Sequence, residues 1–471
     1  MDEGERQMTK KLTKILTKIL LLGLVLAIAL AGCNLIEVNV RMQADEDIAK
    51  IQKSNEKLVA AYTGGQVSVG DVLGEFSSTY NETAYMYYYY FGYEMTESDV
   101  VSLMQDVLQN HVRHEVVAAK FDESNALTDE ELTEVETDAQ TQYDEAIQSA
   151  LESAEGKNDE EKNIRAEVML YEVGRNYDAI HTSLLLDKKY DRMTEMLRDE
   201  VAEVSDDELQ AAYDAQVAED QANYTDGSSF ENAMTGDDAI ICWQPDGYRT
   251  VKHILVMPSD DAKTAYQNAA SALRSAQSQL TSLNSELEGL TGEAEGERTP
   301  EAVQADIDAV QATLPELETA LKAAEDACLN DVKATTDEIY ARLEGGESFE
   351  ALIEEYGEDP GMQNEPTKTR GYYVSADSTN WETSFRDAAM ALENVGDYTL
   401  TPVVSGSGVH IIEYVSDVQG GEVALDEVRD ALYERTLEEM KESHATDTID
   451  GWVAELNPVY DINALQAAVM G

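Results

Sequence analysis

The sequence predicts an α+β protein that is mostly helical, with a small antiparallel sheet and a protruding helical hairpin. Apolar residues recur at helical spacing through most of 97–200. Two short runs, at 248–256 and 408–415, have the composition of buried strands instead. Heptad-like apolar patterns in 262–291 and 303–328 flank a polar loop, which predicts an antiparallel coiled-coil hairpin over 262–330.

The N-terminal segment has the features of a secretion signal. Four lysines precede fourteen uncharged residues, Ile19–Gly32, which end in Leu30-Ala-Gly-Cys33. This order predicts a signal peptide over 1–32, because the apolar run is shorter than the roughly 20 residues that span a bilayer. The ending resembles the lipobox of bacterial lipoproteins, which implies a lipidated Cys33 and a protein held outside the cytoplasm at the bacterial cell membrane. An ordinary signal peptide with an incidental cysteine is the alternative.

Composition excludes several classes of function. The net charge is −62, and removal of 1–32 takes away five basic and three acidic residues, which leaves −64. Such a surface repels nucleic acid. Cys242 and Cys328 give no disulfide framework, and no Cys/His cluster has the spacing of a metal site, so no cofactor or metal is expected. His111 and His114 lie three apart without a further ligand nearby and are predicted to be solvated.

The 439 residues after the signal divide into several segments. Polar residues 33–56 predict a tether, and a strand-turn-strand followed by helices predicts a helical domain over 57–247. Thr128 and Ser205 are each followed three residues later by a glutamate, which predicts two helix N-termini. A second domain is expected at 248–417, interrupted by the hairpin at 262–330. The remaining segment, 418–471, is predicted to be helical.

The run Tyr85–Phe91 is almost wholly aromatic. It suits a surface that grips unfolded chain, since rings bind apolar surface with little loss of entropy, but a core that covers half of the rings would explain it equally. Pro315 lies inside the second hairpin helix and predicts a kink or a break there.

Two of the six histidines open apolar strand-like runs, Val251-Lys-His253-Ile-Leu-Val256 and Gly408-Val-His410-Ile-Ile. Taken alone, each is typical of a strand histidine with a structural hydrogen bond. Between them comes an ordered series of landmarks: Leu343-Glu-Gly-Gly-Glu-Ser-Phe349, Glu358-Asp359-Pro-Gly, Arg370-Gly-Tyr-Tyr373, Trp381, Phe385-Arg-Asp-Ala-Ala and Pro402-Val-Val-Ser405-Gly-Ser407.

This series resembles the parvulin family of peptidyl-prolyl cis/trans isomerases over 248–258 and 331–417. The resemblance implies a proline pocket with the imidazoles of His253 and His410 at its floor. Asp359 would stand where parvulins have Cys or Asp. Ser405 and Ser407 would be hydroxyl partners of the second histidine.

The resemblance also implies a substrate-binding set. Phe385 would form the aromatic wall of the proline pocket, and Trp381 lies where the family usually has Met; core packing is the alternative for both. Leu255, Arg370 and Tyr373 complete the set. The family's Gly-Gly-Asp-Leu-Gly stretch is reduced here to Thr369-Arg-Gly, so Arg370 falls where an apolar pocket residue is expected.

The flanking segments resemble those of SurA- and PrsA-type foldases. The matching stretches are Gly64-Gly-Gln-Val-Ser-Val-Gly-Asp71, Val204-Ser-Asp-Asp-Glu-Leu-Gln-Ala-Ala-Tyr-Asp214 and the helix that begins at Ala424. The resemblance implies that 57–247 and 418–471 build one chaperone domain with the isomerase inserted. It further implies a membrane-anchored foldase that isomerises X–Pro bonds in unfolded secreted proteins, with homodimerisation left open.

Two other functions compete with this one. Arg370 favours a holdase whose parvulin-like domain binds peptide without catalysis, whereas the retained His253, Asp359 and His410 oppose it. A solute-binding lipoprotein of a transporter would need repeated βαβ halves, and the long helical first half argues against them.

Overall fold

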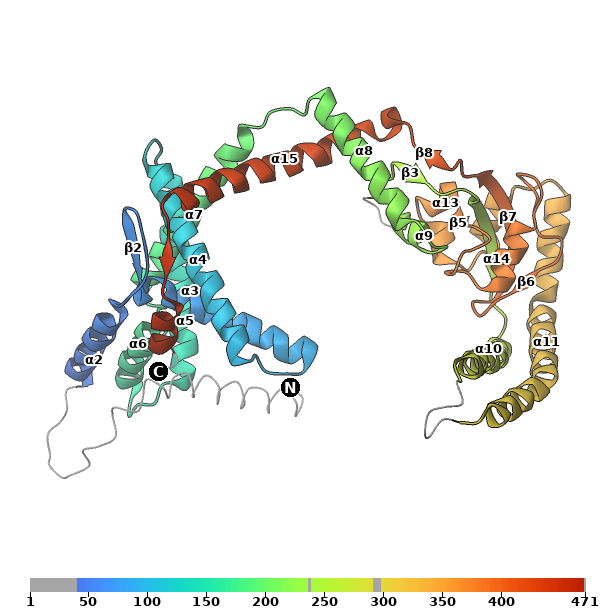
Figure 1. Ribbon diagram of the computed structural model, residues 1–471, viewed down its shortest axis with the longest axis horizontal. Coiled ribbons are helices and arrows are strands. Elements are labelled where there is room, and N and C mark those ends of the chain that lie inside the picture. The colour runs from blue at the N-terminus through green and yellow to red at the C-terminus, as the bar shows by residue number, and fades with distance from the viewer. Residues whose placement is uncertain (1–39, 236–238, 291–297, 470–471) are drawn as a thin grey trace. The chain divides into compact units, whose positions relative to one another are not determined.

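A computed structural model describes residues 40–235, 239–290 and 298–469 (Figure 1). The predicted signal peptide, Cys33 and the start of the predicted tether lie outside these residues. The chain divides into two compact units. Unit 1 holds the described residues up to Glu203 together with those from Leu437 onward, and unit 2 runs from Val204 to Thr436. The α+β prediction is confirmed, and no described helix is both long and apolar enough to cross a bilayer.

Unit 1 is a helical layer built around a three-stranded antiparallel sheet of order β2-β1-β9. Its elements are α2 (Val40–Asn55), β1 (Leu58–Tyr62), β2 (Gly65–Ser68), α3 (Val69–Met86), the π-helical turn η1 (Tyr87–Phe91), α4 (Glu97–Asp122), α5 (Asp129–Ser153), α6 (Asp159–Glu172), α7 (Tyr177–Asp199), the end of α15 (Leu425–Glu455), β9 (Val459–Tyr460) and α16 (Ile462–Val469). The core lies between the sheet, α3 and α4, and it includes Leu465 from α16. Both ends of the chain therefore contribute to one core.

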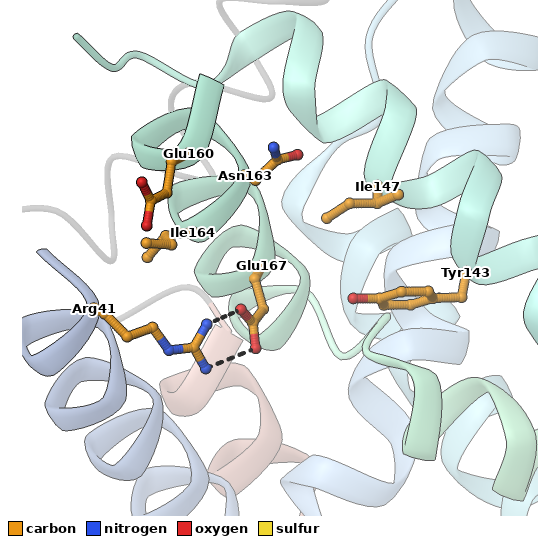
Figure 2. A pocket seen from close by; sticks show the side chains of 7 residues that line it. All are labelled: Arg41, Tyr143, Ile147, Glu160, Asn163, Ile164 and Glu167. Carbon is orange, nitrogen blue, oxygen red and sulfur yellow. Dashed lines mark hydrogen bonds and ion pairs between the residues drawn. The ribbon is translucent and has the colours of Figure 1, made fainter. Parts of the chain in front are cut away.

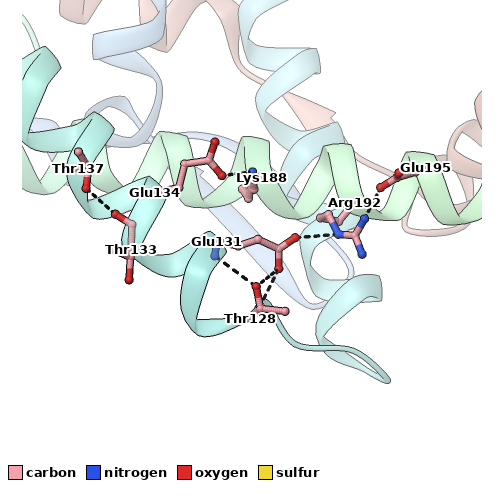
Figure 3. A network of polar contacts seen from close by, with 8 residues as sticks. All are labelled: Thr128, Glu131, Thr133, Glu134, Thr137, Lys188, Arg192 and Glu195. Atoms are coloured by element: carbon pink, nitrogen blue, oxygen red, sulfur yellow. Dashed lines mark hydrogen bonds and ion pairs between the residues drawn. The ribbon is translucent and has the colours of Figure 1, made fainter.

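Helix α5 begins where the sequence predicts. The Thr128 hydroxyl and the Glu131 carboxylate form the expected capping box, and the same Glu131 pairs with Arg192 of α7 (Nε–Oε1, 2.9 Å). One turn further along, Lys188 of α7 pairs with Glu134 (Nζ–Oε2, 2.6 Å). Figure 3 shows this row of charges between the two helices. Glu131 therefore has two roles: it caps the start of α5 and it ties that end of the helix to α7.

The predicted tether is helical over its described part. Helix α2 buries Ala44 and Ile48, and Arg41 forms an ion pair with Glu167 of α6 (Figure 2). These contacts hold α2 on unit 1. His111 also differs from prediction, because it is 7% exposed and lies 3.4 Å from Glu75. It is buried against a carboxylate rather than solvated.

Unit 2 contains a four-stranded antiparallel sheet of order β5-β4-β7-β6. Its elements are α8 (Asp206–Asn223), α9 (Ser229–Ala233), β3 (Trp243–Gln244), β4 (Arg249–Val256), α10 (Asp260–Gly289), α11 (Pro300–Glu344), α12 (Phe349–Tyr356), the 3₁₀ turn η2 (Pro360–Gln363), α13 (Thr367–Arg370), β5 (Tyr372–Val374), α14 (Thr383–Met390), β6 (Val403–Val404), β7 (Val409–Asp417), β8 (Gly421–Glu422) and the start of α15. One face of the sheet packs on α10, α11 and α12. Helix α14 covers the other face.

Unit 2 is wider than the 248–417 segment expected from the sequence. Helix α8 belongs to it because the buried Asp220 carboxylate accepts hydrogen bonds from the backbone N–H of Cys242 (2.6 Å) and Trp243 (3.0 Å). The Tyr213 hydroxyl donates to the carbonyl of Val423 at 2.7 Å. These contacts join the segments on both sides of the predicted domain into the same unit.

The predicted hairpin consists of α10 and α11. Leu283 packs against Val303 and Ile307 near the connecting loop, while the Cys328 thiol lies 3.4 Å from the carbonyl of Ala262 at the base, so the helices run antiparallel. Of the kink or break predicted at Pro315, the break is wrong, because α11 is one helix from Pro300 to Glu344. Proline has no backbone N–H, so the helix lacks one internal hydrogen bond at Pro315. The apolar residues that α11 buries along the hairpin seam keep it helical there.

Candidate active site

The two histidines lie side by side on the central strands of the unit 2 sheet. In the β4–β7 ladder His253 is opposite Ile412 and Leu255 is opposite His410. Because alternate residues of a strand point to opposite faces, both imidazoles share one face. Their Nδ1 atoms are 3.0 Å apart and their ring centroids 4.9 Å apart. Both side chains are buried, at 3% and 4% exposure.

A continuous hydrogen-bonded chain runs through this pair. The Ser405 hydroxyl lies 2.7 Å from His410 Nε2, and His253 Nε2 lies 2.9 Å from Asp359 Oδ2. Asp359 also accepts from the Tyr372 hydroxyl (3.0 Å) and, through Oδ1, from the backbone N–H of Gly361 at the start of η2 (3.0 Å). The five side chains come from different turns or strands, so the fold brings them together.

The protons along the chain have one consistent arrangement when both rings are neutral. An ionised carboxylate only accepts, so His253 donates from Nε2 to Asp359 and accepts at Nδ1. His410 then donates from Nδ1 and accepts at Nε2 from the Ser405 hydroxyl. The backbone N–H of Ser407 donates to the Ser405 oxygen at 3.0 Å, which completes the partners of that hydroxyl. The arrangement orients every polar atom of the chain.

The charges in the site follow from its burial. Burial opposes ionisation of Asp359, but the hydrogen bond and charge of His253, with the donors from Gly361 and Tyr372, lower the pKa of the carboxyl to about 2. Burial, and then the charge of His253, lower the pKa of His410 well below its ordinary value. Burial and the adjacent Asp359 charge raise the pKa of Tyr372. The site therefore holds a carboxylate, a neutral His410 and a neutral phenol at pH 7.

The stability of unit 2 should fall in acid because of His410. The unfolded chain binds a proton on this histidine below pH about 6.5, whereas the buried ring stays neutral, so the unfolding free energy falls by up to about 1.4 kcal/mol per pH unit below that value. Asp359 adds a second loss as the pH falls from about 4 to about 2. His410→Gln should flatten the first slope.

The measurement is the urea-unfolding free energy of the full chain at pH 7.5, 6.5 and 5.5. His444→Gln is the control, because His444 is a half-buried histidine of unit 1 that pairs with Glu200. Equal slopes for wild type and His410→Gln would contradict the assignment.

An aromatic wall covers the histidine pair. Phe385 of α14 is 2% exposed and makes T-shaped contacts with both imidazoles, with centroid distances of 5.4 Å to His253 and 5.1 Å to His410. Trp381 stacks on Phe385 at 4.9 Å and contacts Tyr372 at 5.0 Å. The polar chain thus lies against rings that exclude water from it.

The strand that carries His410 starts at a position that requires glycine. Gly408 has φ +151°, and a Cβ there would come within 2.8 Å of Leu255 Cδ1. The glycine lets the chain turn tightly from the Ser405 loop into β7 against β4. Leu255 itself is buried and lies opposite His410 in the ladder.

Three predicted site residues are not brought to the histidines. Tyr373 packs on Phe230, with centroids 5.2 Å apart, and the Arg370 guanidinium lies 4.5 Å from the Tyr373 ring while donating to the carbonyl of Met234 (3.1 Å). Both belong to the side of β5 opposite Tyr372. The Ser407 side chain is exposed, and only its backbone N–H joins the chain.

Sequence reasoning missed Tyr372. The sequence does show that only one of these two tyrosines can face the histidines, because Tyr372 and Tyr373 are adjacent on a strand and must face opposite sides. Which of them faces the histidines depends on the register of β5, where Val251 pairs with Tyr372.

Comparisons with known proteins agree with this geometry. Residues 312–416 match the Rotamase family model, described as the PPIC-type PPIASE domain. The match includes Asp359, Phe385 and His410, whereas His253 lies upstream of it on β4. No curated protein matches the chain.

Several solved structures align along most of the chain at low identity. Peptidylprolyl isomerase (PrsA) from Bacillus anthracis is 14% identical over 74% of this chain and 97% of that chain, with a TM-score of 0.17. PrsA from Bacillus cereus is 16% identical over 81% and 96%, with a TM-score of 0.18. A structure reported with PEB4 and Cj1289, two SurA-like chaperones of Campylobacter jejuni, is 16% identical over 70% and 94%, with a TM-score of 0.22. TM-scores this low support no conclusion about this chain. The assignment of the domain therefore rests on the family match and on the side-chain geometry. The chain contains a peptidyl-prolyl isomerase domain of the PPIC type.

Proposed function

We propose that the protein is a foldase that isomerises X–Pro bonds through the His253–His410 site and holds unfolded chains through a second surface on unit 1. The observation that carries the first part is the continuous hydrogen-bonded chain from Ser405 to Asp359 against the rings of Phe385 and Trp381. Substrate would be unfolded protein outside the cytoplasm.

The chemistry needs no nucleophile. Rotation about a peptide bond faces a barrier of about 18–20 kcal/mol set by amide resonance. In the twisted state conjugation is lost and the amide charge is redistributed, so a site that binds this state better than the planar ones accelerates rotation. The aromatic wall would take the proline ring, and the pre-oriented dipoles of His253 and His410 would match the altered charge in a water-poor setting.

A direct assay tests isomerisation. Proline tetrapeptides interconvert over tens to hundreds of seconds uncatalysed, and catalytic amounts of the full chain should shorten this in a protease-coupled assay or in exchange NMR. Failure to accelerate would leave the holdase alternative. Arg370 no longer favours that alternative, because its contacts are with Tyr373 and Met234 rather than with the histidines.

Attachment to a membrane rests on the sequence before residue 40. The lysines, the apolar run and Cys33 support cleavage before Cys33 and acylation of its thiol. Each buried CH₂ of an acyl chain contributes about 0.8 kcal/mol, so more than one chain gives stable anchoring. Labelling of cells with radioactive palmitate should mark the protein, and Cys33→Ser should abolish the label.

The second surface is the aromatic segment Tyr85–Tyr93 at the end of α3. Seven of its side chains are exposed: Tyr85, Met86, Tyr88, Tyr89, Tyr90, Phe91 and Tyr93. Its rings contact each other, as in the stacked pair Tyr85–Tyr89 (5.7 Å), rather than the core of unit 1. Aromatic side chains on other recognition domains bind extended proline-rich chain, so this surface would take the same substrate class as the isomerase site.

Removal of this aromatic surface should weaken holding without affecting isomerisation. Tyr89→Ser, Tyr90→Ser and Phe91→Ser together should raise the concentration of protein needed to suppress aggregation of an unfolded client by at least about ten-fold, because stacking on each ring contributes about 0.5–1.5 kcal/mol. Tetrapeptide isomerisation should be unchanged.

A triple variant of scattered exposed apolar residues of unit 1, Met42→Ser, Leu132→Ser and Val459→Ser, is the matched control. Equal loss in both triples would refute a specific role for the aromatic segment.

A further inference from the structure

The loop that places Ser405 against His410 is held from outside the strands. Gly406, at the tip of this β6–β7 loop, uses both of its backbone groups in side-chain contacts. Its N–H donates to Glu382 Oε1 at 2.8 Å, and its carbonyl accepts from Gln267 Nε2 at 2.7 Å. A Cβ on this glycine would come within 2.5 Å of Glu382 Oε1, so the contact is close.

Glu382 connects the two walls of the site. It occupies the N-cap position of α14 but makes no cap hydrogen bond to its own helix. Its side chain instead reaches the Ser405 loop, while Phe385 one turn later forms the aromatic wall. The Glu382 carboxylate therefore links α14, which carries the aromatic wall, to the Ser405 loop.

Gln267 connects the same loop to the inserted hairpin. It lies on α10, the first helix of the insertion, next to Tyr266. Tyr266 is 5% exposed, packs in one cluster with Val404 of β6, and its hydroxyl lies 3.4 Å from both Glu382 Oε2 and the Val404 carbonyl. The base of the hairpin thus packs on the edge strand from which the loop departs.

We propose that Glu382 and Gln267 are positioning residues of the isomerase site, and that the inserted hairpin takes part in catalysis by holding the Ser405 loop through Gln267. Ser405 then donates to His410 Nε2, and this fixes the proton order of the whole chain to Asp359. The inference rests on the proposed isomerase function.

The experiment compares Glu382→Ala and Gln267→Ala with two matched controls. Gln304→Ala removes a glutamine from the same hairpin, where it bonds only along its own helix to Asp308 (2.8 Å). Glu393→Ala removes an exposed carboxylate from the loop after α14. Each full-length variant is measured for kcat/KM on a proline tetrapeptide, for the ¹⁵N shifts of the His410 ring and for its urea-unfolding midpoint.

Both positioning variants should lose about ten-fold in kcat/KM, which corresponds to 1.36 kcal/mol of transition-state stabilisation. Their His410 Nε2 resonance should move as the Ser405 hydrogen bond loosens. Glu382→Gln keeps an oxygen acceptor for Gly406 and should recover most of the activity. The controls should match wild type in all three measurements.

Unchanged His410 shifts together with unchanged kcat/KM in Glu382→Ala and Gln267→Ala would overturn the proposal. So would an equal loss in the two controls. If wild type itself does not accelerate isomerisation, the proposed function fails, and the His410 shifts alone then decide whether Glu382 and Gln267 hold the loop.

Discussion

Replacing His253 and His410 together by alanine is expected to lower kcat/KM for prolyl isomerisation by roughly 100-fold, the scale of removing a pre-oriented polar group from a transition state. The double change removes the floor of the site and leaves the Ser405 hydroxyl and the Asp359 carboxylate without their ring partners. A protease-coupled or exchange-NMR assay of the full chain measures the loss.

The matched control removes two imidazoles that take no part in the hydrogen-bonded chain. His181 and His444 are both in unit 1, and His181→Ala with His444→Ala should leave kcat/KM unchanged. Because His253 and His410 are buried, circular dichroism must show that the double variant is folded. If the double variant is unfolded, kcat/KM is measured on the milder variant His410→Gln instead. Wild-type activity in that variant would exclude a role for the ring.

Phe385→Ala should be the most destabilising single change in unit 2, at about 3–5 kcal/mol of unfolding free energy. Phe385 is 2% exposed and packs between the sheet and α14 with Val251, Val374 and Ile412. Truncation removes buried apolar surface and opens a cavity beside the two imidazoles. Urea unfolding measures the stability, and activity is assayed where the variant remains folded.

A leucine pair separates stability from activity at this position. Phe385→Leu and Phe230→Leu both change a fully buried phenylalanine of unit 2, and each should cost on the order of 1 kcal/mol. Phe230 packs on Tyr248 and Tyr373, away from the histidines. Only Phe385→Leu should lower kcat/KM, because it alone removes an aromatic ring that contacts His253 and His410. An equal loss of activity in both would assign Phe385 to the core only.

The pairing of the two histidines is predictable from the sequence because both lie on strands, whereas Asp359, Ser405 and Phe385 lie on turns and a helix and are assigned only through the resemblance to parvulins. His253 and His410 occupy apolar runs whose alternation and pairing place them on one face, and Asp359 comes directly before a turn that aims it at His253. Arg370 was misplaced because the positive φ of Gly371 (+86°) redirects the chain just before β5. A one-residue difference there exchanges the faces of Tyr372 and Tyr373.

Other features depend on contacts that no local pattern contains. The range of unit 2 is set by the buried Asp220, whose two backbone donors lie more than twenty residues away in the chain. The aromatic run Tyr85–Phe91 has no polar positions, so neither helical nor strand periodicity indicates which side is exposed. The π-helical turn η1 within this run also departs from the residue spacing of an α-helix. Glu382 and Gln267 belong to segments whose meeting follows only from the packing of α10 on β6.

If the chain is exported as proposed, the sheet of unit 1 has a consequence for the order of its folding. Strand β1, near the start of the chain, pairs with β9, and Leu465 of α16 completes the core beside Val67 and Val72. A chain that crosses a membrane from its N-terminus presents all of 204–436 before β9 arrives. Unit 2 is therefore expected to fold before unit 1, because one edge of β1 stays unpaired until β9 has crossed the membrane.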